Sequence, residues 1–272
     1  MGKIEVRFPT IGIEREFQQR ESRITEGKGA APSRGERISR VLEANGHLAT
    51  RVCYLFSAGS VPLYIVVPSG GHLRPDLLRA ISLSGTGDYW TVLIGRRGAV
   101  APPSLCGGIL APLVACDQLY SFSMDDWIES LEMRLRPALK SRQVEAKNFK
   151  QVARELFDRV VSSTENLGAS DAHRALNYLI MQHAGLFLAA LERSGKQVLD
   201  KIETRELHGI GTRHLVAVIF TFLDVVTGIP ERLFCRVDVT EEWPFIADSN
   251  EGVRNALGLA PFVENSSWGM PF

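Results

Sequence analysis

The sequence predicts an α+β fold in which an antiparallel or mixed β-sheet, with a C-terminal hairpin, packs against a cluster of helices. Strand-like and helical segments are segregated along the chain rather than strictly alternating, which favours this class over a doubly wound sheet. The middle of the chain is helical, and two apolar strand-like runs joined by a short link follow in the last third. With 272 residues, 45% of them hydrophobic, the chain can bury a large core. We expect a single domain over residues 1–247 and an irregular tail over 248–272.

The first 57 residues predict a strand followed by helices. Apolar and charged residues alternate over residues 4–8, which is the period of a half-buried strand, and a helix is expected to start within residues 13–17. Residues 26–36 (EGKGAAPSRGE) are rich in Gly, Pro, Ser and charge, and they predict a loop. Residues 37–57 have apolar positions at helical spacing, with a candidate break at Asn45-Gly46.

The next segments predict three strands and a short helix. Residues 62–68 (PLYIVVP) read as a buried strand bounded by turn residues, and residues 74–82 as a helix with Pro75 in its first turn. Two further strand-like runs, WTVLIGRRG and APLVACDQLYSF, flank the turn-rich connection APPSLCGG.

Helical periodicity fills the middle of the chain. One helix is expected over residues 125–135, and a second has its inner stripe at Phe149, Val152, Leu156 and Val160. A third is expected over residues 168–192, with Ser170 as N-cap and Asp171 at the positive end of the helix dipole.

The last third predicts an antiparallel hairpin. The runs HLVAVIFTFLDV and RLFCRVDV are rich in β-branched and aromatic residues, and they flank the short glycine-containing link VTGIP. We therefore expect the two runs to pair with each other.

The charge composition argues against two classes of partner. Thirty-one basic and thirty-one acidic residues give no net charge, which disfavours a general nucleic-acid binder or a protein that adheres to anionic membranes. No apolar run approaches the roughly 18 residues of a membrane-spanning helix, and the first residues lack the apolar core of a secretion signal. We expect a cytoplasmic protein without nucleic-acid or membrane partners.

The four cysteines predict reduced thiols. Cys53, Cys106, Cys116 and Cys235 are scattered along the chain and form no CxxC pair. We expect all four to be reduced and mostly buried, and we expect no metal. A zinc site assembled from distant Cys and His residues stays open as the alternative.

The expected helix after Ser170 offers the first group of candidate binding residues. At about 100° per residue, His173 and Asn177 lie at the edge of the apolar stripe, and Arg174 lies on the opposite side with Asp171. One interpretation is an ordinary amphipathic helix with an Asp171–Arg174 pair. The other is a polar cluster for recognition or proton transfer, because histidine titrates near neutral pH.

The segment RVDVTEEWPF offers the second group. On a strand, Arg236, Asp238 and Thr240 project to one side, and Glu241 and Glu242 then precede a Trp-Pro pair that leaves the sheet. These carboxylates could bind a cation or act as acid and base. The alternative is a solvated strand end with one ion pair to Arg236.

The turn-rich segment IGRRGAVAPPSLCGG offers the third group. Arg96 and Arg97, with free backbone N–H groups nearby, would suit a carboxylate or a phosphate, and Asp117 lies in the following strand-like run. The segment is not a Walker loop, and the chain has no GxGxxG after a strand, no HExxH and no GxSxG. We therefore assign no catalytic residue and expect no cofactor.

Six ordered blocks between Gly2 and Phe245 resemble a known family. They are GKIEVRFPTIGIEREF, VLIGRRGAVAPPSLCGG, CDQLYSF, ARELFDRV, GASDAHRALNYL and RVDVTEEWPF. The chain is similar to the C-terminal domain of unknown function of the PatA and PatG proteases of cyanobactin (patellamide-type) maturation. In those relatives the first block lies downstream of a subtilisin-like protease, whereas here it follows the initiator methionine, so we expect a free-standing module. The chain also continues beyond the point where the relatives' domain ends, so no role is carried over for its tail.

The resemblance implies a setting rather than a reaction. The setting is the biosynthesis of ribosomally made, post-translationally modified peptides, and the missing protease triad means that the relatives' peptidase activity is not carried over. Our first hypothesis is an accessory module that binds a precursor or product peptide, or a partner maturation enzyme, for example by strand addition at the hairpin edge. The alternatives are a peptide-modifying enzyme with a composite site of His173, Asn177, Asp238 and Glu241, and a structural domain that forms a homodimer.

Overall fold

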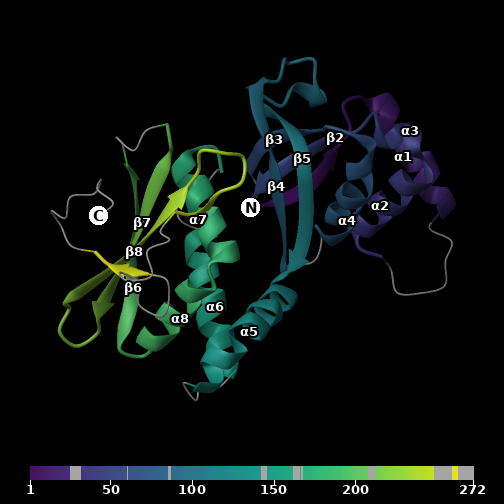
Figure 1. Cartoon of the computed structure of the whole chain (residues 1–272). Coiled ribbons are helices and arrows are strands. Elements are labelled where there is room, and N and C mark those ends of the chain that lie inside the picture. Colours follow the sequence, from purple (N-terminus) through teal and green to yellow (C-terminus); the bar gives the residue numbers. More distant parts are fainter. Residues whose placement is uncertain are drawn as a thin grey trace. The chain divides into compact units, whose positions relative to one another are not determined.

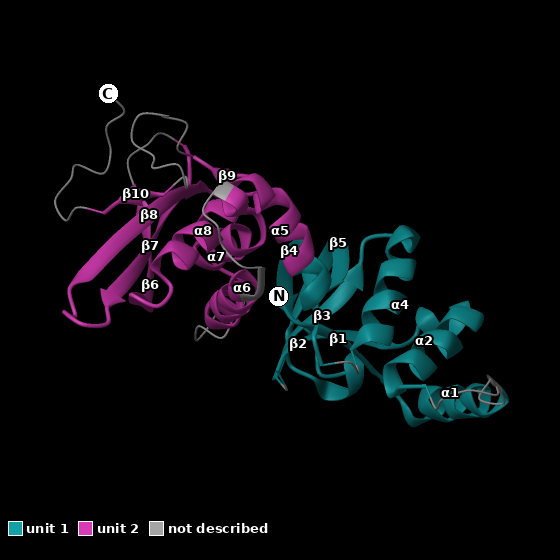
Figure 2. Cartoon of the chain, turned by 90° about the horizontal axis from the view of Figure 1, so that it is seen from below, with its two compact units in different colours: residues 1–127 teal, residues 128–272 magenta. Residues whose placement is uncertain are grey.

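The computed structural model describes residues 1–24, 32–59, 61–84, 87–141, 146–161, 166, 168–207, 212–247 and 259–262. The chain divides into two compact units, residues 1–127 and residues 128–272 (Figure 2). Each unit has its own five-stranded sheet and its own helices (Figure 1), so the α+β class is confirmed. Our expectation of a single domain over residues 1–247 remains a prediction.

The sheet of unit 1 is mixed and has the strand order β1-β2-β3-β5-β4. Its strands are β1 (Lys3–Arg7), β2 (Cys53–Ala58), β3 (Val61–Pro68), β4 (Tyr89–Val100) and β5 (Pro112–Ser123). Only β3 and β5 run parallel to each other. The two outer strands are also linked, because Gly2 and Thr91 exchange backbone hydrogen bonds of 3.0 and 2.8 Å. The strands expected in these places are confirmed, except that β2 was expected to be helical.

The error at β2 has a physical cause. Tyr54 and Phe56 point into one hydrophobic cluster, and Cys53 and Leu55 point into another on the other face of the sheet. A strand buried on both faces is a continuous apolar run without alternation, and periodicity alone does not separate it from a buried helix.

Helices pack on one face of this sheet (Figure 1). They are α1 (Ile11–Ile24), α2 (Arg34–Ala44), α3 (Gly46–Ala49), the short 3-10 turn η1 (Gly71–Leu73) and α4 (Arg74–Leu83). The break at Asn45 is confirmed, and α2 begins at Arg34, three residues before the helix expected from residue 37, because Ser33 and Glu36 form a capping box. The rest of the expected loop, residues 26–31, lies outside the described residues. Where α2 meets α4, a Cβ atom built on Gly35 would lie 2.3 Å from the Ile81 carbonyl oxygen, so only glycine permits this approach.

A disulfide pins the connection between β4 and β5 to the other face of the sheet. Cys106, in the 3-10 turn η2 (Cys106–Gly108), is bonded to Cys53 of β2, with 5.6 Å between their Cα atoms. Both cysteines lie in a small buried cluster with Leu55 and Ile65. The prediction of four reduced thiols is therefore wrong for this pair, which is 53 residues apart in sequence and meets only through the fold. Cys116 and Cys235 form no disulfide and are buried, as expected.

Among the described residues, four helices precede the sheet of unit 2 along the chain. They are α5 (Met124–Ser141), which starts at the end of unit 1, α6 (Ala146–Val161), α7 (Asp171–Gln182) and α8 (Ala184–Arg193). The inner stripe predicted for α6 is confirmed at Phe149, Leu156 and Val160, all buried. The single helix expected over residues 168–192 is instead two, because His183, with φ −93° and ψ 85°, leaves the helical conformation between them.

The sheet of unit 2 is antiparallel and has the order β10-β8-β7-β6, with β9 paired to β8. Its strands are β6 (Gln197–Leu207), β7 (Leu215–Asp224), β8 (Pro230–Asp238), β9 (Phe245–Ile246) and β10 (Ala260–Pro261). The predicted hairpin is confirmed as β7 and β8. Three of the described strands are additional to the prediction: β6, β9, and β10, which lies inside the tail expected to be irregular. Most of that tail lies outside the described residues.

Two searches of the described residues bear on the kind of protein. Among the helices described, none has an apolar stretch long enough to cross a lipid bilayer. Within the same residues, no group of three or more His, Cys, Asp or Glu side chains is placed to hold a metal ion.

Candidate functional site

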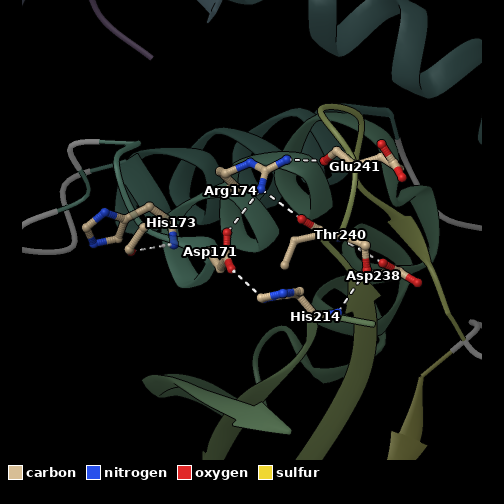
Figure 3. Close-up of polar contacts among 9 residues, drawn as sticks. Asp171, His173, Arg174, His214, Asp238, Thr240 and Glu241 are labelled. Atoms are coloured by element: carbon tan, nitrogen blue, oxygen red, sulfur yellow. Dashed lines mark hydrogen bonds and ion pairs between the residues drawn. The ribbon is translucent and has the colours of Figure 1, made fainter. Parts of the chain in front are cut away.

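Arg174 joins the first turn of α7 to the chain that follows β8. Its Nη1 donates to Asp171 Oδ1 at 3.0 Å and to the carbonyl oxygen of Val239 at 2.8 Å. Its Nη2 donates to the carbonyl oxygen of Glu241. Figure 3 shows the guanidinium between the helix and this segment, so its hydrogen bonds hold backbone rather than an open site.

Asp238, at the end of β8, is a buried carboxylate with fixed partners. Its side chain is 2% exposed, and it accepts hydrogen bonds from Arg213 Nε at 2.6 Å and from the Thr240 N–H at 2.9 Å. Burial raises the pKa of Asp238, but the hydrogen bonds from Thr240 and the hydrogen bond and charge of Arg213 outweigh it, so the pKa lies below its usual value. Asp238 is therefore charged at neutral pH, and its charge is paired.

Thr240 and His214 complete this polar network. The His214 N–H donates to Thr240 Oγ1 at 2.8 Å, and the Val239 N–H donates to the His214 carbonyl oxygen at 2.8 Å. The His214 Nδ1 also lies 3.6 Å from Asp171 Oδ2. The network thus ties α7, the residue before β7 and the end of β8 into one rigid junction (Figure 3).

His173 lies on the other side of this helix end. Its N–H donates to Ser170 Oγ at 3.2 Å, which confirms Ser170 as the N-cap of α7. In Figure 3 its ring points away from Asp238 and Glu241. The structure therefore does not bring this imidazole to the two carboxylates with which we grouped it.

Asn177, one turn further along α7, is paired with another amide. Asn177 and Asn166 exchange side-chain hydrogen bonds of 2.9 and 3.2 Å. A composite catalytic site of His173, Asn177, Asp238 and Glu241 would therefore have to break these amide contacts and the contacts of Asp238.

The turn after β8 presents its side chains to solvent. Glu241 and Glu242 are exposed, and Trp243 and Phe245 have exposed fractions of 53% and 46%. The guanidinium of Arg213 lies 6.0 Å from the centre of the Phe245 ring. The backbone of this turn is fixed by Arg174, while its side chains are available for contact.

The remaining predicted binding residues belong to unit 1. Arg96 on β4 lies 3.8 Å from Asp117 on β5, and the Arg96 side chain is 73% exposed. Arg97 is also exposed. Burial raises the pKa of Tyr64, and the positive charge of Arg97 partly opposes this rise. An ion pair this long and this exposed stabilises the fold by little. The Asp117 side chain is 29% exposed, and a binding role for these residues stays a prediction.

Sequence reasoning missed the outer edge of β6. In the sheet order β10-β8-β7-β6, β6 is the last strand, and no strand among the described residues pairs with its outer side. Its register with β7 is interrupted between Leu199 and Lys201, where Arg159 Nη2 donates to the Asp200 carbonyl oxygen at 2.9 Å. From Lys201 to Leu207 the register is regular, so seven residues offer a continuous edge. The sequence signal was weak because five of the eleven residues of β6 are charged.

Comparisons with known proteins agree with this architecture. Residues 143–251 match the family model described as PatG C-terminal. A solved structure described as "PatG Domain of Unknown Function" has the same fold, with a TM-score of 0.68, 18% sequence identity, and coverage of 91% of this chain and 95% of that one. No curated protein matches the chain. The family match and the shared fold together support the conclusion that this chain carries a PatG C-terminal-type domain.

Proposed function

We propose that the protein is an accessory, non-proteolytic module in the biosynthesis of ribosomally made, post-translationally modified peptides of the cyanobactin kind. Its task is to hold an extended stretch of a precursor peptide along the outer edge of β6. The observation that carries this proposal is the regular edge over Lys201–Leu207, with which no strand in the described part of the chain pairs on its outer side. The family similarity supplies the biosynthetic setting.

The edge is suited to strand addition. An extended peptide that joins a sheet edge gains main-chain hydrogen bonds without any particular sequence, and side-chain contacts then select the sequence. Seven residues of strand span about 24 Å, enough for three or four outward-facing pairs of hydrogen bonds. Because β6 is fixed to β7 through its whole length, the edge is already ordered before a peptide arrives.

The polar residues at the end of β8 support a binding role over a catalytic one. The hydrogen bonds of Arg174 and Asp238 are made with backbone groups, with Asp171 and with Arg213. A general acid or base needs a side chain that can reach a substrate proton. The network instead stabilises the sheet to which the β6 edge belongs.

Hydrogen exchange with the precursor peptide tests the proposal. The probe is a precursor peptide of the cyanobactin kind, made as overlapping synthetic segments, and binding is measured by calorimetry. Alternate amides of Lys201–Leu207 should exchange more slowly with the bound peptide, because neighbouring residues direct their N–H groups to opposite edges. Binding without protection in β6, or no binding by any segment, would contradict the proposal.

Two neighbouring proline variants provide matched controls for each other. Glu203→Pro and Thr204→Pro each remove one N–H, but only one of the two N–H groups faces β7. The variant that loses an inner hydrogen bond should have the lower melting temperature. The other should keep its stability and lose about tenfold in peptide affinity. Equal affinity in that stable variant and the wild type would exclude the β6 edge as the binding surface.

A further inference from the structure

The charges along the outer edge of β6 alternate in sign and balance each other. In the regular part of the strand, residues 201–207, the charged side chains are, in order, Lys201, Glu203, Arg205 and Glu206. Lys201 and Glu203 are 62% and 25% exposed, and the next two are exposed as well. An edge strand is a template for pairing with another chain. A strand whose charges alternate is complementary to a second copy of itself in a suitable register.

Symmetry limits how two copies of this edge pair. Two identical strands related by a two-fold axis perpendicular to the sheet run antiparallel and make an isologous contact. Residues directly opposite each other share a face, and side chains alternate between the faces, so the axis passes beside one residue rather than between two. That residue stands opposite its own copy. A charged residue there would face a like charge, which destabilises a sheet, so the axis does not lie at any of the four charged residues.

Of the uncharged positions in this part of β6, Thr204 is the one that allows the whole regular edge to pair. An axis at Ile202 would pair only residues 201–203 of it, and the strand would then run into Asp200, whose carbonyl oxygen already accepts a hydrogen bond from α6. Leu207 is the last residue of β6, so an axis there would leave the rest of the strand without a partner. Thr204 is the middle one of the seven residues, and with the axis there every one of them has a partner.

The register centred on Thr204 sets opposite charges against each other. Glu203 stands opposite Arg205 of the second copy, and the symmetry repeats this pair. A hydrogen bond from Lys201 at 3.0 Å lowers the pKa of Glu203, so this carboxylate is charged at neutral pH. The Arg205 guanidinium lies 5.4 Å from the centre of the Phe262 ring, a contact that fixes its position without neutralising it. At the axis two threonines face each other, which also favours sheet pairing.

We propose that the protein forms a homodimer in which the β6 edges of two copies pair antiparallel about Thr204 and join the two unit 2 sheets into one. The dimer covers the edge that the proposed function assigns to the precursor peptide, so the peptide and the second copy compete for it. This competition rests on the proposed function, whereas the pairing of two copies does not. Because the contact is made mainly by one strand from each copy, we expect a weak dimer.

Sedimentation equilibrium with the full-length protein tests the association. The mass of the wild type should rise from that of one chain toward that of two as its concentration is raised from about 5 to 500 µM. Alternate amides of residues 201–207 should exchange more slowly at the higher concentration, because each outward N–H gains a partner. A mass of one chain at about 500 µM would overturn the inference.

Charge reversals test the register. Glu203→Arg and Arg205→Glu each turn the two opposite-charge pairs into two like-charge pairs, so each variant should dimerise at least about tenfold more weakly than the wild type. Mixed together, the two variants should associate about as tightly as the wild type, because the mixed dimer again has opposite charges at both places. The double variant Glu203→Arg/Arg205→Glu should also dimerise.

Glu206→Arg is the matched control for these variants. It makes the same change of charge on the same strand as Glu203→Arg, but it stands opposite Ile202 of the second copy, so dimerisation should change by less than about threefold. Melting curves verify that every variant folds. Dimerisation of the two single variants at the strength of the wild type, a mixture that stays monomeric, or an equal loss in Glu206→Arg would overturn the inference.

The inference and the proposed function fail in different ways. If the protein stays monomeric and a precursor segment protects the β6 amides, the inference is wrong and the proposed function stands. If the protein dimerises through β6 and no precursor segment dissociates the dimer, the proposed function is wrong and the inference stands. A bound precursor segment that protects β6 and converts the dimer to monomers would support both.

Discussion

Replacing Asp238 by asparagine should destabilise the protein measurably at neutral pH. The carboxylate accepts from Arg213 and from the Thr240 N–H, and it is 2% exposed. Asparagine keeps one acceptor for Thr240, but it turns an N–H₂ group toward the guanidinium and removes the charge. A hydrogen bond to a charged group is worth about 1.5–3 kcal/mol. Because Arg213 is 46% exposed and can turn to water, we expect a loss of about 2 kcal/mol, at the lower end of the range.

The pH dependence has a definite sign. The pKa of Asp238 is lowered in the folded protein, so its stabilising contribution is present above its unfolded pKa of about 4. It is lost as the pH falls through the folded value. The difference between Asp238→Asn and the wild type should therefore be constant from about pH 7 to pH 5 and shrink below about pH 4.

Chemical denaturation across this pH range is the assay. Glu242→Gln is the matched control, because it makes the same chemical change at an exposed position and should alter stability by less than about 0.5 kcal/mol. A loss below about 0.5 kcal/mol for Asp238→Asn at pH 7, or a loss that persists unchanged at pH 3, would refute the structural role assigned to this carboxylate. Loss of peptide binding at full stability would instead make Asp238 a binding residue.

Two further predictions concern unit 1. Replacing Cys53 and Cys106 together by alanine should lower the free energy of unfolding by about 4 kcal/mol, because the bond closes a loop of 53 residues. Without reductant, two of the four cysteines of the unfolded wild type should accept an alkylating label, and four labels would contradict the disulfide. Gly35→Ala should lower the free energy of unfolding by about 1–3 kcal/mol, because its Cβ would meet the Ile81 carbonyl oxygen at 2.3 Å. The control is Gly12→Ala on α1, whose nearest atom lies at 3.9 Å and which should be neutral or stabilising. Equal effects of the two variants in chemical denaturation would refute the close approach of α2 and α4.

The sequence predicts those elements that local pattern determines. The β7–β8 hairpin follows from two apolar runs and a short turn, and the start of α7 follows from Ser170 and Asp171. Elements that depend on burial by distant parts escaped prediction. The strand β2 is apolar on both faces, and β6 becomes a strand through its pairing with β7 despite its charged sequence.

The candidate site shows the same division. Residue type alone marks Arg174 and Asp238 as unusual on their elements, but it does not reveal that their partners are backbone groups and Arg213. Cys53 and Cys106 show no local spacing that would pair them. The outer edge of β6 depends on the order of the strands in the sheet, which the order of residues in any one strand cannot supply.

The disulfide between Cys53 and Cys106 also determines how proteolytic damage to unit 1 would be detected. Residues 102–105 are exposed and lie just before Cys106, and exposed loops of this kind are preferred sites of cleavage. A chain cut there would keep its two fragments covalently joined, since one contains Cys53 and the other Cys106. On a denaturing gel such nicked protein would migrate near the intact chain until the sulfur bridge is reduced, so purity judged without reductant would overestimate the intact fraction.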